Sequence, residues 1–306
     1  MKHLVILLTI VSSVVYAQSV QVLDTRPIQA NTQNAQLFPS FTSDGNYLLY
    51  TTDGYAGLWI YDLATNTSRK VTETAGAGYH PISTQDGRII YRQDEYVNNL
   101  KYTSYVSLNP QTKEETRISN PGRFVSKPSV SGNKLHFLEN SQLKLKPLTS
   151  QGQPASKATD IMLLNDKLKI FLIISGEMTE LAPRGEGNYI WSELSPTKDK
   201  ILFTKTGDGT YVCDLDGNIL TQLGHANAPR WSDDGRFILF MKDHDDGVQF
   251  TSSEIWISSS DGMQSWQITD TPDKIEMYPQ WSPDNSEIVY HTLDGNIYLT
   301  TISIED

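Results

Sequence analysis

The stretch WSPDNSEIVY at residues 281–290, with DGNIYLTTI at residues 294–302, decides the fold because its pattern recurs along the chain. Each copy opens with Ser or Thr and ends with an aliphatic residue followed two positions later by an aromatic. Self-similarity at a period of about 40 to 50 residues is typical of propeller repeats. The other copies are FTSDGNYLLY from Phe41, ISTQDGRIIY from Ile82, VSGNKLHF from Val130, LSPTKDKILF from Leu194 and WSDDGRFILF from Trp231.

Each copy has the composition of a β-hairpin. A proline precedes three copies (Pro39, Pro229, Pro279), at a strand start where the missing amide costs nothing. The Asp-Gly or Asp-Asn pair tolerates positive φ and favours a tight turn. The aliphatic-x-aromatic ending has the two-residue period of a strand. Further strand-like segments follow most copies, so we predict four-stranded antiparallel blades of an all-β propeller.

The spacing of the copies bears on the number of blades. The closing aromatics are 41, 46, 66, 37 and 50 residues apart. The long interval, from Phe137 to Phe203, contains IMLLNDKLKIFLI from Ile161, which is either an insertion or a degenerate extra blade. We favour six blades, with seven as the alternative. The last copy lacks a fourth strand, and residues 20–28 (VQVLDTRPI) have no blade of their own. We therefore expect this N-terminal strand to close the ring.

The first 17 residues have the pattern of a secretory signal. Lys2 and His3 precede an apolar stretch at 4–15, and Val15-Tyr16-Ala17 suits signal peptidase. We expect a signal peptide at 1–17 and a single propeller domain at 18–306, periplasmic or secreted and not inserted in a membrane. The net charge of −11 argues against a nucleic-acid partner. Cys213 is the only cysteine, and we expect it to be a buried hydrophobe.

WSPDNSEIVY with DGNIYLTTI, and WSDDGRFILF with EIWISSSDGMQSWQIT, resemble the tandem repeats of TolB-like β-propellers over about residues 38–304. One group with such repeats is periplasmic TolB, whose propeller binds the lipoprotein Pal. TolB carries a further domain before the propeller, which we expect to be missing here. The other group is the prolyl oligopeptidase-like peptidases, but no G-x-S-x-G occurs in this sequence. The resemblance implies a non-catalytic propeller that binds another protein of the cell envelope or secreted space.

Residues just before each innermost strand should reach the central channel of a propeller. An aromatic collar there would suit a peptide, a glycan or a partner's side chain, because rings give large contact area at low entropy cost. Packing between blades is the alternative for each ring. The candidate binding residues are Phe38, Tyr79, His80, Phe124, Tyr189, His225 and Tyr278.

A metal-dependent polysaccharide lyase is the alternative function, and a glycan-binding propeller without turnover is a variant of it. No two histidines have a local metal-ligand spacing, so a site would have to assemble across blades. The oligogalacturonate lyases are TolB-like propellers that hold a divalent metal in this way. The resemblance makes His80, His225 and His291 the candidate ligands, and we expect no other cofactor. The acidic loop KDHDDG at residues 242–247 lacks the full calcium pattern, so we expect a solvated hairpin.

Overall fold

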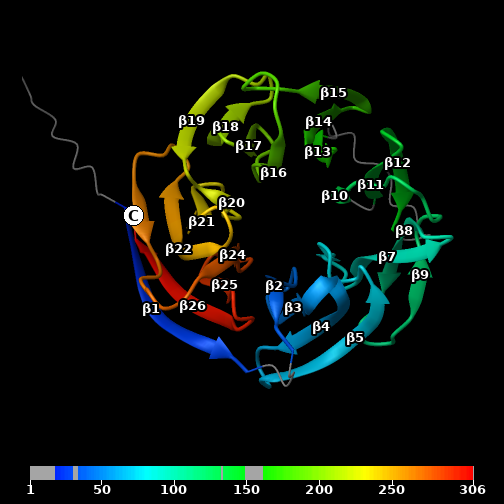
Figure 1. The fold of residues 1–306 in the computed structure, drawn as a ribbon, viewed down its shortest axis with the longest axis horizontal. Coiled ribbons are helices and arrows are strands. Elements are labelled where there is room, and N and C mark those ends of the chain that lie inside the picture. The colour runs from blue at the N-terminus through cyan, green and yellow to red at the C-terminus, as the bar shows by residue number, and fades with distance from the viewer. Residues whose placement is uncertain (1–17, 30–33, 132–133, 149–160, 306) are drawn as a thin grey trace, which may run out of the picture.

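The protein is a seven-bladed β-propeller in a computed structural model that describes residues 18–29, 34–131, 134–148 and 161–305. Seven antiparallel sheets stand radially around a central axis, and the first strand of each blade lies innermost (Figure 1). The predicted signal peptide lies outside the described residues. No helix in the described ranges is long and apolar enough to cross a membrane.

We number the blades in chain order. Five have four strands, and blades 3 and 4 have three strands within the described residues. Blade 1 contains β2 (Leu37–Phe41), β3 (Tyr47–Thr51), β4 (Ala56–Asp62) and β5 (Thr67–Ala75), with a short 3-10 turn, η1 (Asp53–Tyr55), before β4. Blade 2 contains β6 (Ile82–Ser83), β7 (Ile89–Val97), β8 (Leu100–Leu108) and β9 (Glu115–Arg117). Blade 3 contains β10 (Ser129–Ser131), β11 (Lys134–Glu139) and β12 (Gln142–Pro147).

The remaining blades complete the ring. Blade 4 contains β13 (Ile161–Asp166), β14 (Lys169–Ile174) and β15 (Glu177–Leu181). Blade 5 contains β16 (Tyr189–Leu194), β17 (Lys200–Lys205), β18 (Gly209–Asp214) and β19 (Ile219–Gly224). Blade 6 contains β20 (Asn227–Trp231), β21 (Phe237–Asp245), β22 (Phe250–Ser259) and β23 (Ser265–Gln267). Blade 7 contains β24 (Glu276–Trp281), β25 (Glu287–Thr292), β26 (Ile297–Glu305) and the N-terminal β1 (Ser19–Ile28).

The blade count is seven, the alternative rather than the favoured number. The long interval between Phe137 and Phe203 contains β13, β14 and β15, which form a sheet of their own. This blade lacks the Ser-x-Asp-Gly turn, and its first hairpin turns instead through Lys167 and Leu168, both with positive φ. Its apolar residues still pack against both neighbouring blades. The physical pattern of a blade persists here although the sequence signature has been lost.

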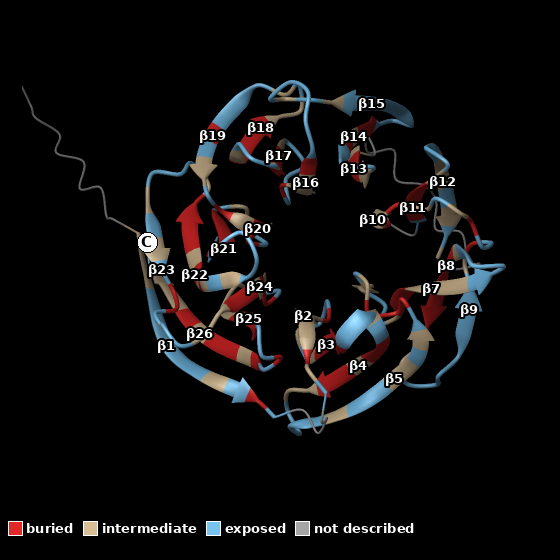
Figure 2. Ribbon diagram, in the orientation of Figure 1, coloured by how far each residue is buried: buried red, intermediate tan, exposed pale blue. Residues whose placement is uncertain are grey.

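The hydrophobic core lies between blades. Because side chains alternate along a strand, Leu48 of β3 packs toward blade 7 and the adjacent Leu49 packs toward blade 2. Buried residues accordingly concentrate in the middle strands, while the outer strands are largely exposed (Figure 2). Cys213 is buried as predicted, and burial raises the pKa of its thiol to about 12.

The repeated turn is held by its own side chains. In blade 7 this turn joins β24 and β25. There the Ser282 hydroxyl donates to Asp284 Oδ1 at 2.7 Å, and Asn285 has a positive φ of 60°. Ser232 donates to Asp234 at 2.6 Å in the same way, and Gly235 takes the positive φ. The Asp-Gly and Asp-Asn pairs therefore adopt the predicted turn conformation.

The N-terminal strand closes the ring, as predicted. β1 pairs antiparallel with β26, from Ser19 opposite Glu305 to Ile28 opposite Ile297. This pairing supplies the fourth strand of blade 7 and covers what would otherwise be an open sheet edge.

Candidate functional site

The innermost strands share a local distortion at their starts. Phe38, His80 and Tyr278 each have a positive φ near 50° and are each followed by proline. In β2 and β24 the pairing register shifts across this position, which marks a β-bulge. We call the face of the ring on which the innermost strands begin the mouth face. In each copy of the decapeptide, the inner strand begins on the mouth face and ends at the repeated turn. These turns therefore lie on the opposite face of the ring.

Aromatic side chains from three blades meet on the mouth face. The ring of Phe38 lies 5.1 Å from that of Tyr55, 4.9 Å from that of Tyr278 and 5.0 Å from that of His291, between centroids. Tyr55 in turn contacts Tyr79 edge-on at 5.1 Å. We call these five residues the mouth cluster. All but His291 are partly exposed, so the cluster presents a mainly aromatic surface to solvent.

His291 is the buried member of the mouth cluster and contacts two of its rings. It is 2% exposed, and its ring stacks on that of Tyr278 at 5.7 Å. Its Nδ1 accepts a hydrogen bond from the Phe38 amide at 3.3 Å. Burial lowers the pKa of His291 to about 4, so the imidazole is neutral at physiological pH. It therefore acts here as an aromatic packing group and a hydrogen-bond acceptor.

Positive charge gathers around the axis beside the mouth cluster. His80 adjoins Tyr79, with ring centroids 4.6 Å apart. Although solvent reaches His80, the protein around it lowers its pKa well below the usual range, and the cations Lys127, Arg230 and Arg92 lower it further. These three cations come from the starts of blades 3 and 6 and from β7. Three cations therefore lie near His80 in a protein whose net charge is −11, and one of them, Arg92, is paired with Asp94 at 2.6 Å.

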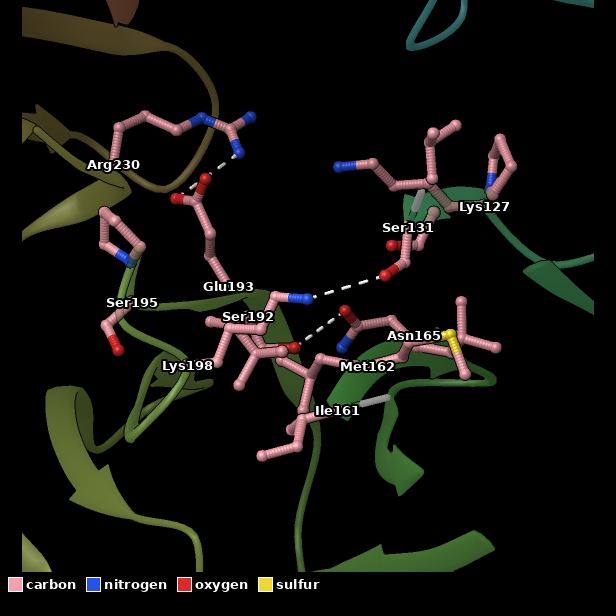
Figure 3. A pocket seen from close by; sticks show the side chains of 17 residues that line it. Lys127, Ser131, Ile161, Met162, Asn165, Ser192, Glu193, Ser195, Lys198 and Arg230 are labelled. Carbon is pink, nitrogen blue, oxygen red and sulfur yellow. Dashed lines mark hydrogen bonds and ion pairs between the residues drawn. The ribbon is translucent and has the colours of Figure 1, made fainter. Parts of the chain in front are cut away.

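A pocket of about 310 Å³ lies among blades 3, 4, 5 and 6 (Figure 3). We call it the axial pocket. Arg230 and Glu193 stand on one side, with Arg230 Nη1 4.0 Å from Glu193 Oε2, and Lys127 extends from the other side. The pKa of Lys127 is lowered to about 8, mainly by burial and also by Arg230, while Glu193 opposes the shift. Lys198 Nζ donates to Ser131 Oγ at 3.4 Å across the pocket.

The lining of the axial pocket is rich in hydrogen-bond donors. Asn165 Oδ1 accepts a hydrogen bond from the Ser192 hydroxyl at 2.6 Å. The amide Nδ2 of Asn165 is buried and has no acceptor among the described residues. Arg230 Nε is likewise buried without an acceptor in the described part of the chain. Aliphatic residues also line the pocket, among them Ile161, Met162 and Leu164. A ligand with acceptor oxygens on a short apolar stem would match this lining.

The structure brings together four of the seven predicted binding residues: Phe38, Tyr79, His80 and Tyr278. Tyr189 is instead 2% exposed and packs on Phe203 in the core, because the chain enters β16 between two blades. Phe124 is exposed beside Arg123. His225 is exposed, stacks on His244 at 5.9 Å between centroids, and approaches the Asp243 carbonyl at 2.6 Å.

Several site residues were not among the predicted ones. Tyr55 comes from η1, a turn outside the repeat, and no sequence signal marked it. Lys127 could have been found, because Lys127-Pro128 has the same pre-proline position as His80-Pro81. Arg230 and Glu193 lie within inner strands, where the repeat predicts only a strand residue.

The candidate metal ligands lie in separate surroundings. His80 contacts Tyr79, His225 contacts His244, and His291 contacts Phe38 and Tyr278. Within the described residues, no group of three or more His, Cys, Asp or Glu side chains is arranged to hold a metal ion. In the acidic loop, Asp245 and Asp246 accept hydrogen bonds from backbone amides of their own turn.

Comparisons with known proteins support the fold and leave the family open. No family model matches the chain. A stretch of 129 residues, 39% of this chain, is 30% identical to an uncharacterized peptidase, YuxL, of Bacillus subtilis (strain 168), and this match spans 18% of that relative. The β-propeller domain of Cps50 (Swd1) from Myceliophteria thermophila aligns with a TM-score of 0.58 at 12% identity, over 93% of this chain and 100% of that one.

Two further solved structures align with this chain. An oligogalacturonate lyase in complex with manganese aligns with a TM-score of 0.50 at 15% identity, over 88% of this chain and 78% of that one. TolB from Acinetobacter baumannii aligns at 0.47 with 16% identity, over 90% of this chain and 57% of that one. At such identities a likeness shows the fold alone. The chain is therefore a β-propeller, and its function has to be argued from its own side chains.

Proposed function

We propose that this chain is an exported, non-catalytic binding module that docks a protein partner of the cell envelope or secreted space on its mouth face. The observation that carries the proposal is the mouth cluster, in which four partly exposed rings from three blades are in unbroken contact. Tyrosine is enriched among the residues that dominate binding energy in protein interfaces, because its ring buries a large area while few rotatable bonds are frozen.

The mouth cluster is held rigidly, which favours a role in binding. Buried His291 fixes both the ring of Tyr278 and the amide of Phe38. Arg92 lies over the ring of Tyr79 at 4.2 Å and is itself paired with Asp94 at 2.6 Å. Preorganised side chains lose little conformational entropy on binding, so more of the contact energy appears as affinity.

The test compares two truncations on opposite faces. Tyr55→Ala removes the central ring of the mouth cluster. Met263→Ala is the control, because Met263 is 84% exposed on the β22–β23 turn of the opposite face. A partner would be captured by crosslinking in the native envelope and then purified. We expect Tyr55→Ala to weaken its binding by about tenfold or more and Met263→Ala to leave it unchanged.

The opposite pattern would overturn the proposal. If the partner binds the Tyr55→Ala protein as tightly as the wild type, the mouth face is not its docking surface. Repeated crosslinking that recovers no specific protein would also count against it. Thermal unfolding of both variants checks that each remains folded.

A further inference from the structure

We propose that the axial pocket is a carboxylate-binding site that accepts an acidic side chain of the protein partner. This inference rests on the proposed function, since the partner that covers the mouth cluster would supply the acidic residue. It assigns a specificity to a pocket that extends along the inner strands from Lys127, near the mouth face, to Lys198 in the β16–β17 turn.

The charge of the lining points to an anion. Lys127, Lys198 and Arg230 line the pocket, and Glu193 is the one carboxylate among its described lining residues. Lys127 and Arg230 are also among the charges that lower the pKa of His80, which is consistent with their place in the pocket lining. Three cations facing one carboxylate in an acidic protein leave local positive charge for a ligand to neutralise.

Hydrogen-bonding capacity points the same way. Arg230 Nε and Asn165 Nδ2 are buried donors without acceptors in the described ranges, and Arg230 only reaches Glu193 at 4.0 Å. Buried donors are normally satisfied, so unpaired donors that line a cavity mark a place where acceptor atoms are missing. A carboxylate brings two acceptor oxygens and forms strong, charge-assisted hydrogen bonds with guanidinium and ammonium groups.

The shape and apolar part of the pocket favour a peptide side chain over other anions. Ile161, Met162 and Leu164 would pack on the methylene groups of a glutamate, whereas inorganic phosphate has no apolar part. No aromatic ring occurs among the described lining residues, so a sugar acid would find no flat surface for stacking. The volume of about 310 Å³ suits one side chain better than an oligosaccharide.

His80 connects the axial pocket to the mouth cluster. Its ring contacts Tyr79 of the cluster, and its pKa responds to Lys127 and Arg230 of the pocket. In this proposal, a partner segment seated on the aromatic rings extends an acidic side chain past His80 to Lys127, at the mouth end of the pocket.

The experiment uses N-acetyl-Ala-Glu-Ala-amide as the probe, with its Gln counterpart, inorganic phosphate and digalacturonate as comparators. Binding is followed by chemical shifts of the isotope-labelled full chain. We expect the Glu peptide to bind and to perturb Lys127 and Arg230, while the Gln peptide binds at least about tenfold more weakly. Tighter binding of phosphate or digalacturonate at this pocket would overturn the assignment to a peptide carboxylate.

Three variants separate charge recognition from a loss of folding. Lys127→Met should weaken binding of the Glu peptide by about tenfold, whereas Glu193→Gln should strengthen it because a repelling carboxylate is removed. Lys113→Met, in the exposed turn after β8 on the opposite face, should have no effect. Weaker binding in the Glu193→Gln protein would contradict the proposal.

The captured partner distinguishes failure of this inference from failure of the proposed function. A partner that needs Tyr55 but binds the Lys127→Met protein normally would leave the function standing and refute the carboxylate site. Loss of partner binding in both Tyr55→Ala and Lys127→Met proteins supports both.

Discussion

The residue before the proline at the start of an inner strand determines what each blade contributes near the axis. Phe38, His80 and Tyr278 occupy this position with similar backbone conformations, and Lys127 occupies it in blade 3. A non-glycine residue with positive φ is disfavoured and is retained only where the surroundings hold it. The positive φ recurs before proline at Ala228 in blade 6, so this backbone frame holds side chains of different kinds, whereas Lys127 has no positive φ.

Glu276 offers a test of how burial acts on a single residue. It is 1% exposed, its carboxylate accepts a hydrogen bond from the Thr271 hydroxyl, and its Oε2 has no partner in the described part of the chain. Burial raises the pKa of Glu276 from 4.5 to about 6, and Glu254 adds to the rise. The folded state thus holds this proton more tightly than the unfolded state, so the free energy of unfolding falls as pH rises from about 4.5 through 6.

We predict that Glu276→Gln stabilises the protein at pH 8, because it keeps an acceptor for Thr271 and removes the buried charge. The gain is at most about 2 kcal/mol and should vanish near pH 4. Urea unfolding at the two pH values measures it, with Glu177→Gln on exposed β15 as the control. Equal stability of the variant and the wild type at pH 8 would show that the carboxylate is not destabilising.

For single residues, the sequence predicted which ones precede an inner strand better than it predicted which side chains they contact. The repeat located Phe38, His80 and Tyr278 because each precedes a strand whose pattern was clear. It could not predict that Tyr55 joins them, because η1 is specific to one blade and its contacts form only when three blades meet. Tyr189 was expected near the axis but is buried: it packs on Phe203 of its own blade and lies in a core cluster with Leu172 of blade 4, a contact that the repeat pattern does not encode.

The element that closes the ring is β1, which pairs with β26 although they lie at opposite ends of the chain. The hydroxyl oxygens of Thr25 and Thr300 are 3.0 Å apart across this pair, 275 residues apart in sequence. Ile28 is buried with Leu299 and residues of blade 1. Both backbone pairing and apolar packing therefore hold the two ends of the chain together.

We predict that the double substitution Thr25→Cys and Thr300→Cys forms a disulfide on oxidation and raises the stability of the protein. In the chain-entropy model, closing so long a loop is worth up to about 5 kcal/mol. Non-reducing electrophoresis reports the bond, and thermal unfolding before and after reduction reports the gain. Each single cysteine variant is the control. Failure of the oxidised double variant to crosslink within one molecule would contradict the closure.

Blade 4 shows how far the elements could be predicted. The alternating apolar residues of IMLLNDKLKIFLI predicted a hairpin, and β13 and β14 form it. Its status as a separate blade could not be decided from the sequence, because a hairpin inserted into another blade would show the same alternation. Only its packing, toward blade 3 on one side and blade 5 on the other, decides the count.

Across the whole molecule, the net charge contrasts with the charge near the axis. The chain has 36 acidic and 25 basic residues, yet Lys127, Arg230 and Arg92 all lower the pKa of His80. The axial pocket extends from Lys127, near the mouth face, to Lys198, in the β16–β17 turn of the opposite face. A partner docked on the mouth face would therefore meet the aromatic rings first and the cationic pocket beyond them.

The most direct test of the central claim is photocrosslinking to the partner from defined positions. p-Benzoylphenylalanine would replace Tyr55 on the mouth face in one protein and Met263 on the opposite face in another, each expressed in the native envelope. We predict that the partner crosslinks from position 55 and not from position 263. A partner that crosslinks from position 263 and not from position 55 would contradict docking on the mouth face.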